Sequence, residues 1–159
     1  SHIEACNRLM EKTTITVNKK YKNVVVSAGG FPKDINMVQA QKSIDRITPI
    51  VEEGGNIFFF AECIDGYGNK YFEDFFEIKT STEMFETLLT DYQINRQTAY
   101  NLKRITENYR CYLYSNFSKE DTERMGFIKL NTPEEILDYI GDDIAAVVPS
   151  SYSFYFKVI

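Results

Sequence analysis

Two side chains three residues apart could together hold a carboxylate. Gln39 and Lys42 lie in a segment whose apolar residues recur at steps of three and four, which indicates a helix. At about 100° per residue, both fall on the face opposite the apolar stripe. An ammonium group beside a side-chain amide supplies charge and directed donors for a carboxylate. From the spacing alone, the simpler interpretation is that these residues and Arg46 form the solvent-exposed face of an amphipathic helix.

Other residue types that carry chemistry are sparse. Glu62 and Asp65 stand at and after the end of a predicted strand, where a general base could act, although most such carboxylates are solvated or cap a helix. The only histidine is His2, so we expect the chemistry of this chain not to use histidine. The three cysteines are widely spaced, and the glycines form neither a dinucleotide fingerprint nor a phosphate loop. We therefore predict no metal-binding or cofactor-binding residue in this chain.

Small and polar residues follow the predicted strands. Ser27, Gly29 and Gly30 come after the first of these strands, Glu62 ends the next, and Ser115 ends the third. In an open α/β sheet, ligands bind beyond the carboxyl ends of the strands, so we expect these residues to cluster at one edge. Glycines there let a ligand approach the backbone, and a following helix start favours an anion. Turns in general have a similar composition, which is the alternative explanation.

Short β-branched or aromatic runs alternate with helix-like segments, which predicts a βαβ arrangement. We expect a single α/β domain over residues 1–159, a Rossmann-like three-layer sandwich with a mostly parallel sheet. The expected strands are 23–27, 56–62, 110–115 and 144–148, with an edge strand at 153–158 and a short strand at 14–17. The expected helices are 36–47, 71–76, 81–89, 96–108, 119–125 and 132–139.

Composition narrows the class of protein. A chain of 159 residues with 43% hydrophobic content can bury one core. The net charge is -5 and the basic residues form no stripe, so we expect no nucleic-acid partner. The apolar runs are too short to cross a bilayer, and the start lacks a secretory pattern. We therefore expect no membrane partner and a cytoplasmic location.

Residues 25–42, VVSAGGFPKDINMVQAQK, resemble the segment that opens the C-terminal domain of the lactate racemase family. The shared features are a Ser-x-Gly-Gly-aromatic-Pro turn, an Asp-x-Asn helix start and a Gln-Ala-x-Lys sequence. Residues 52–69 and 99–115 are similar to the next two units of that domain. The likeness spans roughly residues 2–148 and is strongest over residues 23–69.

The resemblance implies a larger two-domain isomerase that racemises or epimerises a small 2-hydroxyacid. It implies that this chain is the C-terminal, substrate-binding domain and is inactive alone, and that the missing N-terminal domain carries a tethered nickel-pincer nucleotide. The substrate's α-hydrogen would leave as hydride to that cofactor, while histidines of the other domain move the hydroxyl proton. By position, Gln39 and Lys42 match the family's residues that hold the substrate, with Ser27, Gly29, Gly30 and Gln97 as further substrate-binding residues.

Two departures bear on the substrate. Val38 stands where lactate racemases commonly carry tyrosine, and the chain has no tryptophan, which some members use to cover the site. Gln97 stands near the expected place of that tryptophan or of a related histidine. A different 2-hydroxyacid or a sugar-type substrate is therefore open as an alternative to lactate.

An alternative from another class is a non-catalytic α/β domain that binds a partner or ligand. Tyr67, Tyr109, Tyr112 and Tyr152 would then form an exposed aromatic surface. Exposure of these side chains, away from the strand ends, would distinguish this alternative from the racemase.

Overall fold

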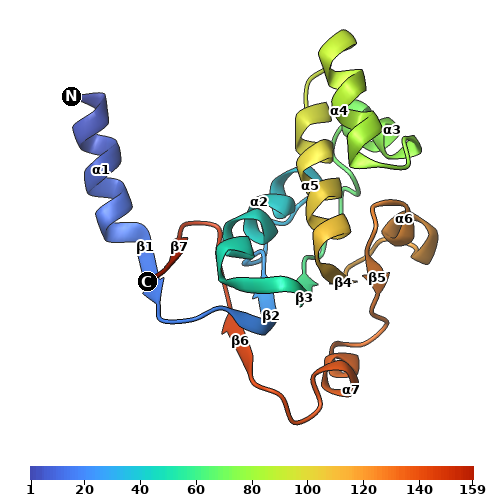
Figure 1. Ribbon diagram of the computed structural model, residues 1–159. Coiled ribbons are helices and arrows are strands. Elements are labelled where there is room, and N and C mark those ends of the chain that lie inside the picture. The colour runs from blue at the N-terminus through green and yellow to red at the C-terminus, as the bar shows by residue number, and fades with distance from the viewer.

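The structure is a computed structural model that describes residues 1–159. Its helices and strands alternate along most of the chain (Figure 1). In chain order they are α1 (His2–Thr13), β1 (Thr14–Val17), β2 (Tyr21–Ser27), α2 (Met37–Ile47), β3 (Val51–Phe60), α3 (Lys70–Asp74), α4 (Ser81–Thr90), α5 (Arg96–Asn108), β4 (Arg110–Tyr114), α6 (Lys119–Arg124), β5 (Ile128–Lys129), α7 (Ile136–Ile140), β6 (Ala145–Val148) and β7 (Tyr155–Val158). Short 3-10 turns occupy Thr48–Ile50, Phe75–Glu77 and Pro133–Glu135. None of the helices has both the length and the apolar character that crossing a membrane requires.

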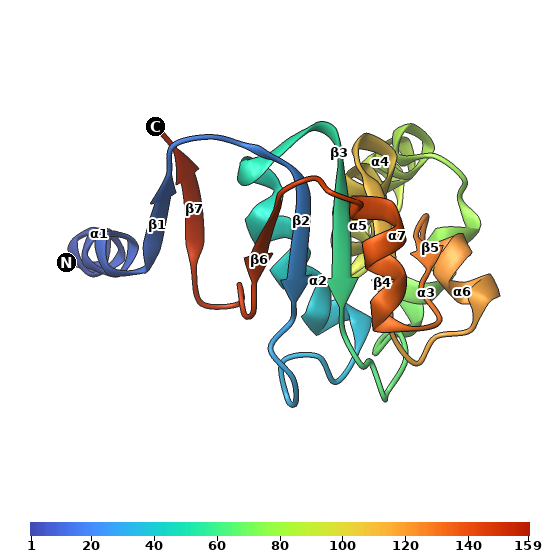
Figure 2. The ribbon, with the colours of Figure 1, turned by 90° about the horizontal axis from the view of Figure 1, so that it is seen from below.

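The main sheet has five strands in the order β5-β4-β3-β2-β6, and all neighbouring pairs are parallel. The expected α/β class with a parallel sheet is therefore confirmed. In the register, Ser27 lies opposite Phe60, and Phe60 lies opposite Tyr114. The segments that follow these three strands consequently leave the sheet at one edge, which is the lower edge in Figure 2.

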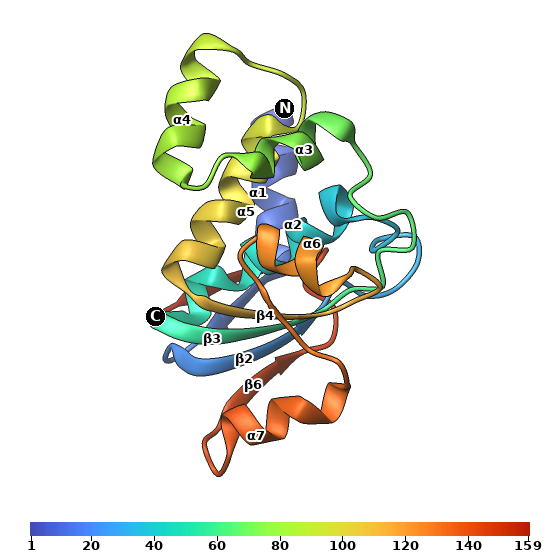
Figure 3. The ribbon, with the colours of Figure 1, turned by 90° about the vertical axis from the view of Figure 1, so that its right-hand side faces the viewer.

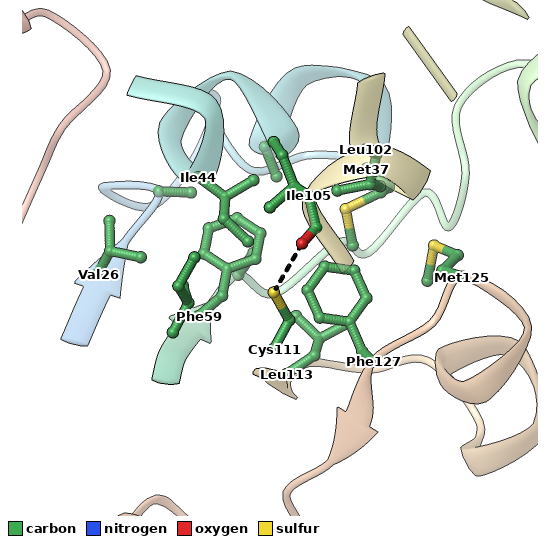
Figure 4. Close-up of a cluster of buried hydrophobic side chains, with 14 of the residues drawn as sticks. Val26, Met37, Ile44, Phe59, Leu102, Ile105, Cys111, Leu113, Met125 and Phe127 are labelled. Atoms are coloured by element: carbon green, nitrogen blue, oxygen red, sulfur yellow. Dashed lines mark hydrogen bonds between the residues drawn. The ribbon is translucent and has the colours of Figure 1, made fainter. Parts of the chain in front are cut away.

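The two faces of the sheet are covered unequally. Helices α2 and α5 lie over one face, where a single core of 27 buried residues forms (Figures 3 and 4). The other face is covered by α7, which packs on a cluster of only three buried residues, Phe58, Tyr112 and Leu130. The third layer of the sandwich is therefore one short helix, and part of this face is open. Val147, which points to it from β6, is 67% exposed.

Two strands differ from expectation. The segment 153–158 was expected as an edge strand of the main sheet. Instead, β7 pairs in parallel with β1 in a separate two-stranded sheet. The short strand expected at 14–17 is confirmed and supplies that partner. Strand β5 was missed because two residues are too few to show an alternating pattern.

The start of α2 is fixed by contacts from the loop after β3. Asn36 caps the helix, since its side-chain oxygen accepts the Gln39 N–H at 3.1 Å. The backbone N–H of Met37 donates to the carbonyl of Gly66 at 3.0 Å. Gly68 has a φ of +83°, and an added Cβ would collide with the Asn36 side chain. Glycine is therefore required where this loop closes over the helix start.

The predicted stripe of α2 is confirmed. Four of its apolar side chains are fully buried against the sheet: Met37, Ala40, Ile44 and Ile47. Gln39 and Lys42 lie on the other side of the helix and are half-buried. The domain therefore holds these two polar side chains on a rigid element.

The unequal covering of the sheet gives a stability test with two valines on neighbouring strands. Val26→Ala should lower the free energy of unfolding by about 1–3 kcal/mol, because Val26 is fully buried in the main core. Val147→Ala should change it by less than about 0.5 kcal/mol, because that side chain meets solvent. Urea denaturation of both variants checks the difference. Equal losses would mean that the second face is covered as well as the first.

Candidate functional site

A cleft of about 530 Å³ lies beyond the carboxyl ends of the strands. We call it the strand-end cleft. Its polar lining residues are Ser27, Asp34, Glu62, Ser115, Asn116, Lys129 and Asn131, with Gly30 at the turn. The structure thus brings Ser27, Gly30, Glu62 and Ser115 together, as their places after the strands predicted. Of the two candidate bases, Glu62 reaches the cleft and the exposed Asp65 does not.

A buried carboxylate ties the walls of the strand-end cleft together. Asp34 is 6% exposed and accepts the backbone N–H of Glu62 at 3.1 Å, while its own carbonyl accepts the Cys63 N–H at 2.9 Å. These bonds join the turn after β2 to the turn after β3. A buried carboxylate would be costly without such donors, so the contact defines the spacing of the two turns.

The opposite wall carries a partly desolvated cation. The Lys129 ammonium donates to the carbonyls of Ser115 at 2.6 Å and Phe117 at 2.7 Å. Burial lowers the pKa of Lys129 below its usual range. Because its partners are neutral carbonyls, the positive charge stays available to an anion or a hydroxyl oxygen in the cleft.

Gln39 and Lys42 are hydrogen-bonded to each other. The Lys42 ammonium donates to the side-chain oxygen of Gln39 at 2.7 Å. This bond leaves the amide NH₂ of Gln39 and the remaining N–H bonds of Lys42 free to donate. The pair therefore presents charge and directed donors at one point, the combination that a carboxylate needs.

Lys33 and Tyr152, which were not predicted as site residues, lie beside this pair. The ammonium groups of Lys33 and Lys42 lie 5.6 and 5.9 Å from the centre of the Tyr152 ring. Gly29, at φ +92°, packs here rather than in the strand-end cleft, because an added Cβ would lie 2.7 Å from the Ser150 hydroxyl. Gly30 lines the strand-end cleft, whereas Gln39 and Lys42 do not. The sequence pattern gave no signal for Tyr152, because its contacts are made across the fold.

Gln97 lies apart from both groups. It is exposed at the start of α5 and accepts a hydrogen bond from the Tyr92 hydroxyl at 3.1 Å. It does not line the strand-end cleft. Its assignment as a substrate-binding residue therefore stays a prediction drawn from resemblance.

The helical spacing suggested that Arg46 lies on a freely exposed face of α2, and the structure contradicts this. Its guanidinium donates to the carbonyl of Phe154 at 3.3 Å and lies 4.3 Å from the centre of the Tyr155 ring. These contacts attach β7 and the segment before it to α2. The expectation was wrong because a distant segment of chain covers this side of the helix.

The exposed tyrosine surface of the partner-binding alternative is absent. Tyr67 is 8% exposed and Tyr112 is 2% exposed, while Tyr109 and Tyr152 are half-buried. The Tyr67 hydroxyl donates to Asp121 at 2.9 Å and accepts from Arg124 at 2.8 Å, which joins α6 to the loop after β3. Tyr112 stacks on Phe58 in the small core under α7. These rings stabilise the fold.

The residues present do not offer a metal site. No group of three or more His, Cys, Asp or Glu side chains is arranged to hold an ion. Burial, with Asp34 and Glu62 nearby, raises the pKa of the Cys63 thiol to about 12. Cys111 lies inside the main core with its thiol directed at the Ile105 carbonyl, 3.9 Å away (Figure 4), and burial also raises its pKa. Neither thiol is a ready thiolate ligand.

Comparison with known proteins decides the family. The family model for the lactate racemase C-terminal domain matches residues 17–142. The chain belongs to the lactate racemase family. A lactate racemase from Thermoanaerobacterium thermosaccharolyticum is 32% identical over 92 residues, which are 57% of this chain and 21% of that protein.

Solved structures agree with this lactate racemase C-terminal domain fold. The lactate racemase apoprotein from Thermoanaerobacterium thermosaccharolyticum matches with a TM-score of 0.81 at 24% identity, covering 98% of this chain and 40% of that one. A protein from Thermotoga maritima matches with a TM-score of 0.62 at 12% identity, covering 97% of this chain and 41% of that one. The chain therefore spans less than half the length of these relatives.

The thiols of this lactate racemase-family domain should differ sharply in reactivity. At pH 8, iodoacetamide should modify the exposed Cys6 quickly and spare Cys63 and Cys111, because burial keeps both neutral. Because folding raises the pKa of Cys63, the unfolded chain loses this thiol proton at a lower pH than the folded chain does. The free energy of unfolding should therefore fall as the pH rises from the pKa of the unfolded thiol toward about 12. Peptide mapping by mass spectrometry measures the labelling. In urea, all three cysteines should be modified. Rapid labelling of Cys63 in the native protein would contradict its burial.

Proposed function

We propose that this chain is the substrate-binding domain of an enzyme that racemises or epimerises a 2-hydroxyacid. The observation that carries the proposal is the hydrogen-bonded pair of Gln39 and Lys42, held half-buried on α2 within a lactate racemase-family domain. In this proposal, the Lys42 ammonium and the Gln39 amide bind the substrate carboxylate. The two residues act as one unit because the lysine is oriented by the glutamine oxygen.

Ser27 and the glycine turn would contact the rest of the substrate. The Ser27 hydroxyl oxygen accepts the Gly29 N–H at 3.0 Å, so its own O–H is free to donate to a substrate oxygen. Gly30, at φ +76°, has no neighbour within 4 Å of an added Cβ, so the turn leaves open space at the cleft. The serine would therefore fix the orientation of the acid, and the turn would let it approach the backbone.

The strand-end cleft favours a larger substrate than lactate. A volume of about 530 Å³ lies within the range typical of small-molecule sites and exceeds what a three-carbon acid needs. Its polar side chains, including Asn116, Lys129 and Asn131, could hydrogen-bond further hydroxyl or acidic groups. We therefore include a longer 2-hydroxyacid or a sugar-type acid in the proposal.

By resemblance to the family, the nickel-pincer cofactor would be held by an N-terminal domain of the longer enzyme, and the donors of this chain do not fit a metal. When bound there, that nucleotide supplies the centre that accepts and returns hydride. The role of this domain is to present the substrate's α-carbon and exclude water, and we expect the domain to be inactive alone. Helix α1 has no buried residue and exposes Ile3, Leu9 and Met10, which supports contact with further protein (Figure 1).

The proposal predicts a specific loss in the full-length holoenzyme. Lys42→Ala should reduce kcat/KM by about tenfold to a hundredfold, since a desolvated contact to a charge contributes about 1.5–3 kcal/mol. Cofactor loading and the thermal midpoint should stay nearly unchanged, because Lys42 is outside the buried stripe. Racemisation of lactate and malate and epimerisation of gluconate at C2, followed by chromatographic separation of the stereoisomers, measures the effect.

Lys103→Ala on α5 is the matched control, because Lys103 is also a half-buried helical lysine and forms no ion pair. Arg46→Ala is unsuitable, since that residue attaches the segment before β7 to α2. Wild-type activity of Lys42→Ala on every acid that the enzyme converts would contradict the proposed site. If the wild-type holoenzyme converts none of these acids, the proposed reaction is contradicted.

A further inference from the structure

The segment between β6 and β7, residues 149–154, is attached to α2. We call it the tail segment. Ser151 is fully buried, and its hydroxyl donates to the Ser43 carbonyl at 2.8 Å. Arg46 holds the other end through the carbonyl of Phe154. Tyr152 lies between these two attachments in the sequence, and the tail segment leaves β6 on the side of the sheet where the turn after β2 also lies (Figure 2). Its ring is therefore placed by the fold and is not a freely moving surface side chain.

Two cations lie over this ring without an acidic partner. The Lys33 and Lys42 ammonium groups both lie within 6 Å of the Tyr152 ring centre. Neither lysine is among the ion pairs of the structure. The ring attracts each cation through its electron-rich face, but it neutralises neither charge. Both positive charges are therefore available to an anion.

The turn after β2, which leads directly into α2, meets the distant tail segment here. Gly29 belongs to the turn after β2, and an added Cβ there would contact both the Ser150 hydroxyl and the Lys33 stem, at 2.7 and 3.6 Å. The turn, the tail segment and α2 are therefore packed against one another at Lys33 and Lys42. The family match ends at residue 142, before the tail segment begins.

We propose that Tyr152 is a positioning residue that orients the ammonium groups of Lys33 and Lys42 toward the anionic end of the substrate. The tail segment is then part of the substrate site. This inference rests on the proposed function, because the anion is taken to be the substrate carboxylate. It adds Lys33 as a second cation and a ring that limits where both lysines can point.

The test compares variants of Tyr152 in the full-length holoenzyme, assayed on whichever of lactate, malate and gluconate is converted. Tyr152→Leu should raise KM by about three- to tenfold, the loss expected for such a contact, with a smaller change in kcat. Tyr152→Phe keeps the ring and should restore most of the lost affinity. Tyr71→Leu, an exposed tyrosine on α3, controls for a general loss of stability. An unchanged KM in Tyr152→Leu would overturn the inference.

A second measurement does not depend on turnover. Acylation of lysines, followed by mass spectrometry, should show faster labelling of Lys33 and Lys42 in Tyr152→Leu than in the wild type or Tyr152→Phe. Equal labelling in all three proteins would also overturn the inference. If Lys42→Ala loses activity while Tyr152→Leu behaves as wild type, the proposed function stands and the role of Tyr152 fails. If Lys42→Ala is fully active, both the proposed function and the role of Tyr152 fail.

Discussion

Helix α2 packs four fully buried apolar side chains against the parallel sheet, and the polar site is built on its other side. Three further contacts fix the position of this helix: the cap at Asn36, the loop closed by Gly68, and the buried Ser151 hydroxyl on the Ser43 carbonyl. Each contact comes from a different part of the chain. Because a substrate group must be held to within a fraction of an ångström, a helix fixed on several sides is a suitable support for Gln39 and Lys42.

Much of this arrangement could be predicted from local pattern. The 3.6-residue period located α2, and the small residues after successive strands located the strand-end cleft, because parallel strands end at one edge. The missed features depend on contacts between distant residues. Nothing near Arg46 signals that residues 154 and 155 cover it, and nothing near Tyr152 signals that two lysines of another segment meet its ring. The resemblance selected Lys42 from several similar helical lysines, which the helical period could not do.

The uneven layers of the sandwich are consistent with a domain that has further protein against it. A parallel sheet is usually covered on both faces, yet here α7 covers the second face only in part and α1 covers nothing. The relatives of known structure are more than twice as long as this chain, so such surfaces need not meet solvent in a longer protein. The candidate cleft lies beyond the carboxyl ends of the strands, outside the main core.

The charge distribution supports anion binding more directly than the overall composition does. The chain has a net charge of -5, which alone would disfavour a negatively charged substrate. Most of its ion pairs are exposed lysine or arginine contacts to carboxylates, and such pairs contribute little to stability. Lys33, Lys42 and Lys129 differ, because their neighbours are a ring, an amide oxygen and backbone carbonyls. Lys129 shares the strand-end cleft with Asp34 and Glu62, whereas Lys33 and Lys42 form no ion pair with a carboxylate. The unneutralised positive charge is therefore found at Lys33 and Lys42.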